Sequence, residues 1–298
     1  MLGKQLWLNL ALLCVVAALL IIAYLEPGLE HPVSDPTLTS LSATEINQII
    51  LTSATSTPVK LQREQDGWII VEPIRVNANE SRVDGILKLL QAKSFAKYPV
   101  AHQTLSNYGL DKPKASLKYN DLEIEFGDTE ALNNRRYVRV GDNIHLIGDH
   151  YYYQSQLLLT ALIDTALLPN NAVLDSIQLP GINLFRKKNG WELRENQTPA
   201  MALDAMMSIV DEWRYARAIQ IDRYHNNDVT VGQVSLSLEN GSQINFDIVS
   251  ESPDLILGRK DLGISYHFAP QQAVRMLGFP QPVDHSDRQM INADAVAQ

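Results

Sequence analysis

Cysteine is nearly absent from this chain. Cys14 is the single cysteine among 298 residues, and it lies inside an apolar run near the N-terminus. The rest of the chain therefore holds no thiol, which excludes a cysteine nucleophile, a Cys-ligated zinc site and a CxxC redox site there. An oxidising compartment is compatible with this composition but is not demonstrated by it.

Positive charge is also scarce. The formal net charge is −9, from 25 Lys and Arg against 34 Asp and Glu. Because proteins that bind nucleic acid normally present an excess of basic residues, we expect no nucleic-acid partner. The apolar fraction of 45% and the charged fraction of 20% indicate a globular chain.

Recognisable catalytic and cofactor motifs are missing. The sequence contains no GxSxG, P-loop, HExxH, GxGxxG or EF-hand pattern, and its seven histidines form no HxH or HxxxH pair. Asp121, Glu123 and Glu125 alternate along one strand and are interpreted as a solvated face rather than an acid–base pair. We therefore expect no enzymatic activity, metal or cofactor, although a hydrolase triad assembled from distant residues stays open.

The longest feature that is present is an uncharged run near the N-terminus. Leu6–Leu25 carries no charge and one Asn, and about 20 apolar residues of helix cross a bilayer. Lys4 precedes the run and no Lys or Arg follows until Lys60, so the N-terminus is expected inside. No small-x-small site follows, which disfavours a cleaved signal peptide. The sequence therefore predicts a single-pass bacterial inner-membrane protein, with the bilayer as a partner and residues 26–298 in the periplasm.

A Gly-Trp phrase that opens a strand occurs twice, at Gly67-Trp68 and Gly190-Trp191, 123 residues apart. An amphipathic helical stripe follows each phrase, and the two stripes match at an offset of 120. They are Val83, Ile86, Leu87 and Leu90, and Leu203, Met206, Met207 and Val210. Ile124 and Phe126, in a hairpin that turns at Asn120-Asp121, match Ile244 and Phe246 at the same offset. The pattern predicts an internal repeat.

The predicted fold class is α+β: an N-terminal transmembrane helix, then two tandem, duplicated modules of antiparallel hairpins, each packed on an amphipathic helix. A last short helix is expected over 271–278, capped by Gly278. The expected divisions are a cytoplasmic N-terminus and anchor (1–25), a stalk (26–42), the first module (43–155), a connecting helix (156–171), the second module (172–280) and a flexible tail (281–298).

Three short stretches are singled out by their aromatic residues. Trp68 and Trp191 are interpreted as repeat-equivalent structural residues, whereas exposed indoles would mark an envelope glycan- or lipid-binding module. Two further stretches are candidate interaction sites, since tyrosine is favoured at interfaces. They are Tyr108, Gly109 and Leu110 in one loop, and Tyr151, Tyr152 and Tyr153 in an aromatic cluster. Both also have a structural interpretation, as a tight connection and as cover for the junction between modules.

Several of these motifs resemble a known bacterial family. Gly67-Trp68, Glu72-Pro73, Ala78-Asn79 and above all NYGLDKP at 107–113 are similar to the domain of unknown function 4340, over most of residues 45–215. Such families look like accessory parts of gliding-motility-type ABC transport systems. The resemblance implies an extracytoplasmic, membrane-anchored, non-catalytic accessory or scaffolding protein of a transport or envelope assembly, with integral-membrane transporter subunits as partners. The second repeat lacks the Tyr-Gly-Leu-Asp-x-Pro stretch.

Overall fold

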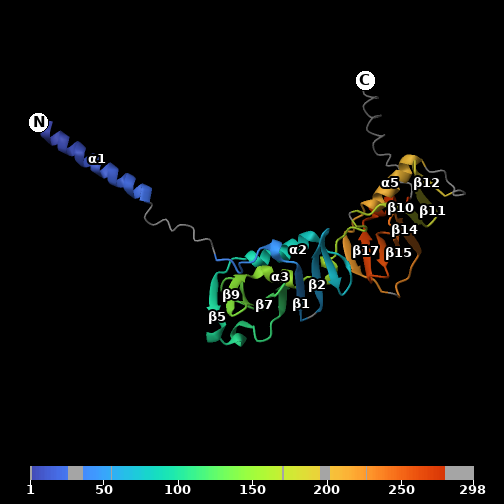
Figure 1. Cartoon of the computed structure of the whole chain (residues 1–298), viewed down its shortest axis with the longest axis horizontal. Helices are drawn as coiled ribbons and strands as arrows, with labels where there is room; N and C mark the ends of the chain where they lie inside the picture. The colour runs from blue at the N-terminus through green and yellow to red at the C-terminus, as the bar shows by residue number, and fades with distance from the viewer. Residues whose placement is uncertain are drawn as a thin grey trace, which may run out of the picture.

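Two antiparallel sheets make up most of the molecule, and they lie side by side along its long axis with helices against them (Figure 1). The computed structural model describes residues 2–25, 36–54, 56–169, 171–194, 202–225 and 227–278. The predictions for the start of the stalk and for the tail 281–298 lie outside the described residues.

The N-terminal helix α1 spans Leu2–Leu25. Within the part of the chain that the structure describes, no helix is both long enough and apolar enough to cross a membrane. The prediction of a transmembrane anchor over Leu6–Leu25 is therefore wrong, and so is the predicted single-pass inner-membrane localisation.

The first sheet has nine strands in the order β4-β3-β2-β1-β6-β7-β8-β9-β5. They are β1 (Gln48–Ser53), β2 (Ser56–Glu64), β3 (Gly67–Glu72), β4 (Val76–Asn77), β5 (Ala96–Pro99), β6 (Ala115–Tyr119), β7 (Leu122–Thr129), β8 (Arg135–Val140) and β9 (Asn143–Gly148). The helices of this module are α2 (Glu80–Leu87), α3 (Tyr152–Ser155) and the short 3-10 turns Ala43–Glu45, Lys88–Gln91, Val100–His102, Leu105–Tyr108 and Asp149–Tyr151. Apolar side chains alternate along β1, β2 and β6, so one face of the sheet is buried under α2.

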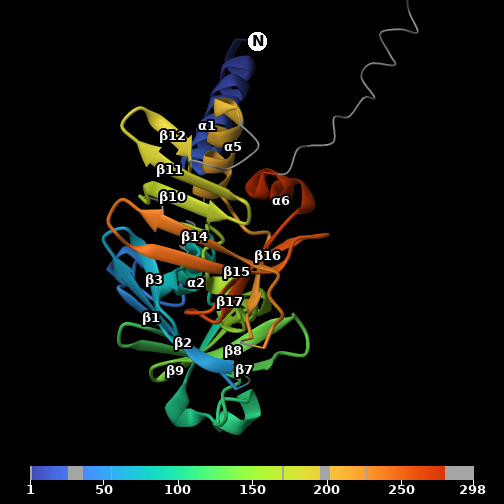
Figure 2. The ribbon, with the colours of Figure 1, turned by 90° about the vertical axis from the view of Figure 1, so that its right-hand side faces the viewer.

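The second sheet has eight strands in the order β12-β11-β10-β14-β15-β16-β17-β13. They are β10 (Leu174–Leu179), β11 (Ile182–Lys187), β12 (Gly190–Leu193), β13 (Gln220–Arg223), β14 (Gly232–Leu238), β15 (Gln243–Ser250), β16 (Leu255–Arg259) and β17 (Ile264–Phe268). Helices α5 (Leu203–Arg214) and α6 (Pro270–Leu277) lie beside one another (Figure 2). The fully buried Trp213 joins them, because its indole Nε1–H donates to the carbonyl oxygen of Met276 at 2.8 Å.

The predicted fold class, α+β with a transmembrane helix, is wrong. Antiparallel strands dominate and the helices are few. The apolar stripe after Gly67-Trp68 predicted a helix of several turns, but α2 spans only Glu80–Leu87 and the stripe continues in the 3-10 turn Lys88–Gln91. The predicted hairpins join into sheets of nine and eight strands. One short helix covers only part of the buried face of such a sheet, so strands rather than helices define the fold.

The two sheets share one strand order, apart from the extra edge strand β4. β1 therefore corresponds to β10, β6 to β14, and the edge strand β5 to β13. Cross-strand pairs fix which residues are equivalent. Four pairs of the first sheet each have an equivalent pair in the second sheet. They are Arg63–Trp68 with Arg186–Trp191, Phe126–Val138 with Ile248–Leu257, Val138–His145 with Leu257–Tyr266, and Arg136–Ile147 with Leu255–Phe268.

The offset of 120 predicted for the helical stripe and the hairpin that follows it is wrong. The Gly-Trp offset of 123 continues into the helices, where Val83, Ile86, Leu87 and Leu90 correspond to Met206, Ile209, Val210 and Trp213. In β7 and β15, Ile124 and Phe126 correspond to Phe246 and Ile248. A shift of three residues lays one helical stripe on another, and a shift of two preserves strand alternation. Periodicity therefore allowed a register that the cross-strand pairs exclude.

The end of the predicted stalk is part of the first module. Leu38 is buried and its N–H donates to the carbonyl of Ala92 at 2.7 Å. In the second module, the N–H of Leu167 donates in the same way to the carbonyl of Ala216 at 3.0 Å. Each module thus begins with an equivalent extended lead-in, so the folded part starts before the predicted residue 43.

The segment between the modules is not the helix predicted over 156–171. Only α4 (Leu159–Leu162) is helical, and the chain beyond it pairs with both modules through the bridges Ile163–Ala78 and Ala166–Arg217. These bridges satisfy backbone groups that a helix would otherwise satisfy internally. The buried side chains Leu162, Ile163, Leu167 and Leu168 belong to one continuous core that includes residues of both sheets. The modules are therefore joined by packing and pairing.

Candidate functional site

The candidate loop Tyr108–Leu110 packs against β7 and β8. Gly109 takes a left-handed φ of 65°, and Leu110 is 2% exposed. Gly127 lies opposite, and a Cβ there would be 2.2 Å from the carbonyl oxygen of Tyr108. The Tyr108 ring stands edge-on to Tyr137, with 4.8 Å between the centroids. These contacts support the structural interpretation of the NYGL stretch, because backbone and side chains face the sheet.

The three candidate tyrosines of the aromatic cluster lie in different surroundings. The Tyr152 ring lies under the Arg136 guanidinium, 3.7 Å from its carbon, and the Tyr151 ring is 4.1 Å from His150. Both rings are half-buried, whereas Tyr153 is 62% exposed. The structure does not bring these tyrosines together with Tyr108 into one site.

The two Gly-Trp tryptophans pack on their modules. Trp68 is 4% exposed, and its backbone N–H donates to Oε1 of Glu80, at the start of α2, at 2.7 Å. Trp191 is half-buried and packs against the core. Trp68 therefore offers no ring for a sugar to stack on, which removes one of the two platforms of the glycan-binding hypothesis.

A buried serine and histidine meet in the first module. Ser94 Oγ lies 2.9 Å from Nδ1 of His145, and both residues are 5% exposed. Burial, helped by the charge of Lys97, lowers the pKa of His145. A nucleophilic serine needs its hydroxyl proton aimed at the base, but Ser94 Oγ also donates to the carbonyl of Ala96 at 3.1 Å. No carboxylate among the described residues bonds His145, so the pair lacks the orienting group of a triad.

Phe95, 41% exposed, lies between two hollows at the surface beside these residues. One hollow of about 560 Å³ is lined by the lead-in, Ser94 and His145. The other, of about 440 Å³, is called here the Phe95 hollow. Its lining residues are Lys93, Phe95, Asn133, Asn134, Arg135 and the turn 148–151.

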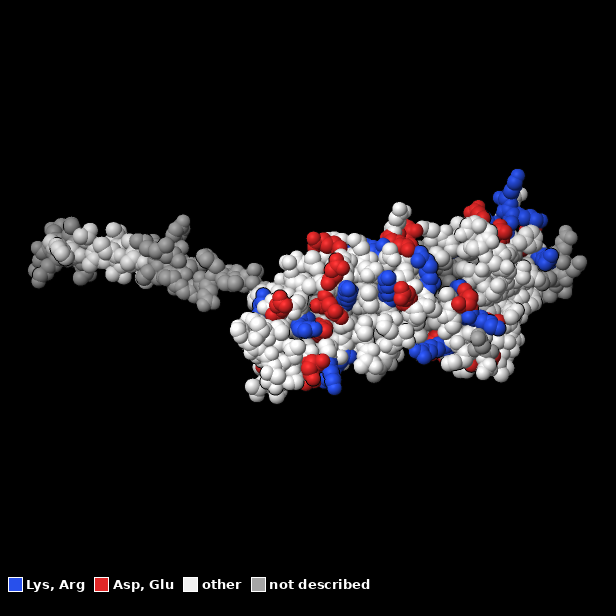
Figure 3. Space-filling model, turned by 60° about the horizontal axis from the view of Figure 1, so that its bottom comes forward, with Lys and Arg blue, Asp and Glu red and all other residues white. Residues whose placement is uncertain are grey.

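Two cations lie over the Phe95 ring. The Arg135 guanidinium carbon is 3.8 Å from the ring centroid, and Nζ of Lys93 is 5.3 Å from it. Such contacts are attractive because the ring face carries partial negative charge. Elsewhere, on the face shown in Figure 3, acidic and basic side chains are interspersed. A gathering of cations around an exposed ring is thus a local feature of an acidic chain.

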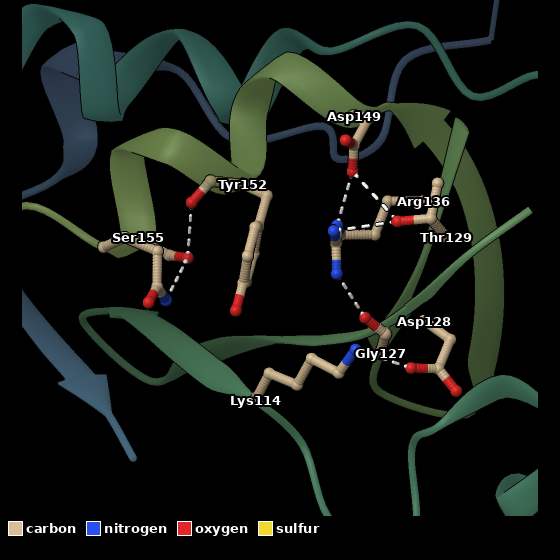
Figure 4. A network of polar contacts seen from close by, with 9 residues as sticks. Lys114, Gly127, Asp128, Thr129, Arg136, Asp149, Tyr152 and Ser155 are labelled. Atoms are coloured by element: carbon tan, nitrogen blue, oxygen red, sulfur yellow. Dashed lines mark hydrogen bonds and ion pairs between the residues drawn. The ribbon is translucent and has the colours of Figure 1, made fainter. Parts of the chain in front are cut away.

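A buried arginine, Arg136, lies next to the lining residue Arg135 and forms a network of polar contacts (Figure 4). Arg136 donates from Nε to Oδ1 of Asp149 at 2.6 Å, from Nη1 to the carbonyl of Gly127 at 2.6 Å, and from Nη2 to Oγ1 of Thr129 at 2.8 Å. Its side chain is 8% exposed. All three bonds go to fixed acceptors, so the network anchors the turn that begins at Asp149.

The second module carries apolar residues at the equivalent positions. Arg136, His145 and Ser94 correspond to Leu255, Tyr266 and Ala218, since the N–H of Ser94 donates to Pro36 as that of Ala218 donates to Thr165. All three counterparts are buried. The second module therefore folds without the polar residues that the first module has at these three positions.

Comparison with protein-family models gives a match that covers more than half of the chain. The model of the family "Domain of unknown function (DUF4340)" matches residues 68–234. The chain belongs to this family. The DUF4340 match begins in β3 of the first module, ends in β14 of the second, and reaches further along the chain than the resemblance predicted. No curated protein and no solved structure matches the chain.

Sequence reasoning missed Phe95, Lys93 and the buried pair Ser94 and His145. The basic stretch Arg135-Arg136-Tyr137 was visible, but its two arginines point to opposite faces of β8, one half-buried and one buried. The pairing of β5 with β9 brings Phe95 to this stretch from some forty residues away. No local pattern marks that meeting.

Proposed function

We propose that this chain is a partner-binding accessory subunit of a transport assembly, and that the outward side of α5 is its contact surface. The observation that carries the proposal is a row of exposed apolar side chains. Leu203, Met207 and Tyr215 are 58%, 40% and 70% exposed. Leu203 and Met207, four residues apart, lie on one side of α5, and Tyr215, which follows the last residue of α5, lines the same hollow as Met207. Contiguous exposed apolar groups rimmed by polar residues are typical of protein–protein contact sites.

The equivalent helix shows that this row is not required by the fold. At the offset of 123, Leu203 and Met207 correspond to Glu80 and Asp84 of α2, and position 211 corresponds to Lys88. Glu80, Asp84 and Lys88 are exposed and charged, as a solvated helix face normally is. The second module replaces two of these charges with apolar groups and leaves them in contact with solvent.

Charge around the row indicates what kind of partner fits. A hollow of about 530 Å³ runs beside Met207 and Tyr215 and is also lined by Asp204, Asp211 and Glu212. Glu212 forms an ion pair with Arg275, whereas Asp204 and Asp211 form none with any described residue. The surface therefore fits a partner helix with an apolar stripe flanked by Lys or Arg.

The transport assembly is proposed to be of the ABC type, with permease and ATPase subunits as partners. Residues 68–234 match the DUF4340 model, and the resemblance noted in the sequence implies an accessory part of an ABC system. The packed junction supports a scaffolding role, because a partner held on α5 would be fixed relative to the first module through the bridges at Ile163 and Ala166.

Co-purification with the permease and ATPase subunits of an ABC system, after gentle detergent extraction, tests the proposal. The full chain should retain them, and Leu203→Glu with Met207→Glu should lose them while keeping its unfolding midpoint. The matched control, Asp84→Ala with Lys88→Ala on α2, should bind as the wild type does. Failure of the wild type to retain these subunits, or equal retention by the Leu203→Glu, Met207→Glu variant, contradicts the proposal.

A further inference from the structure

One ring nitrogen of the buried His145 opens into the hollow of about 560 Å³ beside Phe95, called here the His145 hollow. His145 is 5% exposed, and its one side-chain hydrogen bond to a described residue joins Nδ1 to Oγ of Ser94. Among the residues that the structure describes, no fully buried side-chain nitrogen or oxygen lacks a hydrogen-bond partner. Since Nε2 has no such partner, it is not fully buried, and the space that it reaches is the hollow that His145 lines.

The surrounding hydrogen bonds decide what Nε2 offers to a ligand. Oγ of Ser94 donates its single proton to the carbonyl oxygen of Ala96 at 3.1 Å. The same oxygen then accepts from His145, so the proton of the imidazole lies on Nδ1, 2.9 Å away. Burial, helped by the charge of Lys97, lowers the pKa of His145, so the ring is neutral near pH 7. Nε2 is therefore an acceptor with a free lone pair.

Lys97 places a group of the opposite kind beside this acceptor. It lies directly across from His145 in the antiparallel pair of β5 and β9, so the two side chains share a face, with Cβ atoms about 4.5–5.5 Å apart. Lys97 is exposed, lines the hollow, and its ammonium forms no ion pair or hydrogen bond with any described residue. Its flexible stem lets this charge meet an anion in the hollow.

The walls of the hollow are suited to the apolar body of a small molecule. Pro36, Leu38 and Val140 line it, and the hydroxyls of Thr37 and Thr39 donate to backbone carbonyls rather than into the space. No Asp or Glu is among its described lining residues. The volume falls in the range of small-molecule sites, about 300–1,000 Å³. The hollow thus combines one neutral acceptor, one cation and apolar walls.

The second module has no such pair of groups at the equivalent place. His145 corresponds to Tyr266, and Lys97 corresponds to Ile221, because each lies across from the other in its own edge pair. Tyr266 is 2% exposed and Ile221 is 6% exposed. An aromatic and an aliphatic side chain at these positions complete the same fold. The acceptor and the cation are therefore specific to the first module and are not required for folding.

We propose that the His145 hollow binds a small organic acid that carries a hydroxyl group, with the hydroxyl donating to Nε2 of His145 and the carboxylate on the ammonium of Lys97. The apolar body of the ligand lies against Leu38 and Val140. An ammonium group would also donate to Nε2, but Lys97 repels it. An amide would bring a carbonyl and a further N–H, for which the apolar walls offer no partner. This site is separate from the α5 contact surface, and neither depends on the other.

Calorimetric titration of the full chain at pH 7 with 4-hydroxybenzoate, benzoate and phenol tests the site. 4-Hydroxybenzoate should bind most tightly, because it alone has both the hydroxyl and the carboxylate. His145→Phe should weaken it by about 10-fold and remove its preference over benzoate. Lys97→Gln should also weaken it by about 10-fold and remove its preference over phenol. Added salt should weaken the binding of the two carboxylates but not that of phenol.

Matched controls come from the second module. His267→Phe and Lys187→Gln, which remove a half-buried histidine and an exposed lysine, should bind 4-hydroxybenzoate as the wild type does. Lys97 is exposed, so Lys97→Gln keeps the test decisive if His145→Phe fails to fold. The inference is overturned if 4-hydroxybenzoate shows no saturable binding at millimolar concentration, or if benzoate or phenol binds as well. It is also overturned if either folded variant keeps the preference that it should lose.

Discussion

Among the charged side chains of the first module, we expect the loss of Arg136 to lower the stability of the fold most. Its side chain is 8% exposed and donates to Asp149, Gly127 and Thr129. Arg136→Met keeps most of the volume but leaves the Asp149 carboxylate and the Gly127 carbonyl without their donors. Breaking a buried ion pair from one side costs about 3–5 kcal/mol.

Partial solvent access sets the expected magnitude at the lower end of that range. The Asp149 side chain is 27% exposed, so water replaces part of what Arg136 supplied, and we expect a loss of about 3 kcal/mol in the free energy of unfolding. With a urea m-value of about 2 kcal/mol/M, this lowers the unfolding midpoint by roughly 1.5 M. Urea titration followed by far-ultraviolet circular dichroism, and by tryptophan fluorescence, to which the buried Trp68 contributes, measures it.

Two comparisons make the result decisive. Arg186→Met removes an arginine that is 43% exposed and 3.7 Å from Glu239, and should cost less than about 1 kcal/mol. Adding Asp149→Leu to Arg136→Met should recover part of the loss, because no buried charge then remains unpaired. The second module, with Leu255 at this position, already folds in that way. Equal losses for Arg136→Met and Arg186→Met, or a further loss in the double variant, would refute this reasoning.

Three further predictions concern single side chains. Gly127→Ala should lower the free energy of unfolding by about 1–3 kcal/mol, because a Cβ would lie 2.2 Å from the Tyr108 carbonyl; urea titration checks this. The hydrogen bond to Asp247 raises the pKa of Tyr224 from its usual 10.0 to about 12. The folded state then holds this proton more tightly, so stability should fall between about pH 10 and pH 12, and less steeply in Tyr224→Phe. Trp213→Phe leaves the Met276 carbonyl unpaired and should cost about 1–3 kcal/mol by thermal unfolding.

Local chemistry made several elements predictable. The hairpin that turns at Asn120-Asp121 is present, with Tyr119 opposite Leu122, because Asn tolerates the positive φ of 51° found there. The last helix ends at Gly278 in the left-handed conformation, as its glycine indicated. In such places the residue type itself restricts the backbone, so neighbours far away in the chain are not needed.

The candidate site was much less predictable than these elements. Tyr151 was a candidate and does line the Phe95 hollow, but the sequence placed it in an aromatic cluster rather than beside Lys93 and Arg135. The residues that line the Phe95 hollow come from the segment after the 3-10 turn Lys88–Gln91, from the start of β8, and from the end of β9 with the turn that follows it. Their meeting requires β5 to pair with β9 at the far edge of the sheet, which no spacing in the sequence records.

The sequence by itself determined that the chain contains two copies of a strand-rich unit, each with a strand that begins at a Gly-Trp pair and an apolar helical stripe after it, because periods of 2 and 3.6 are visible among neighbouring residues. Tertiary structure decided the rest. A period is unchanged by a shift of two or three residues, so only cross-strand pairing fixed the register of the copies. An apolar run suits a helix or a buried extended segment equally well, so only pairing with Ala78 and Arg217 made the connection between the modules extended.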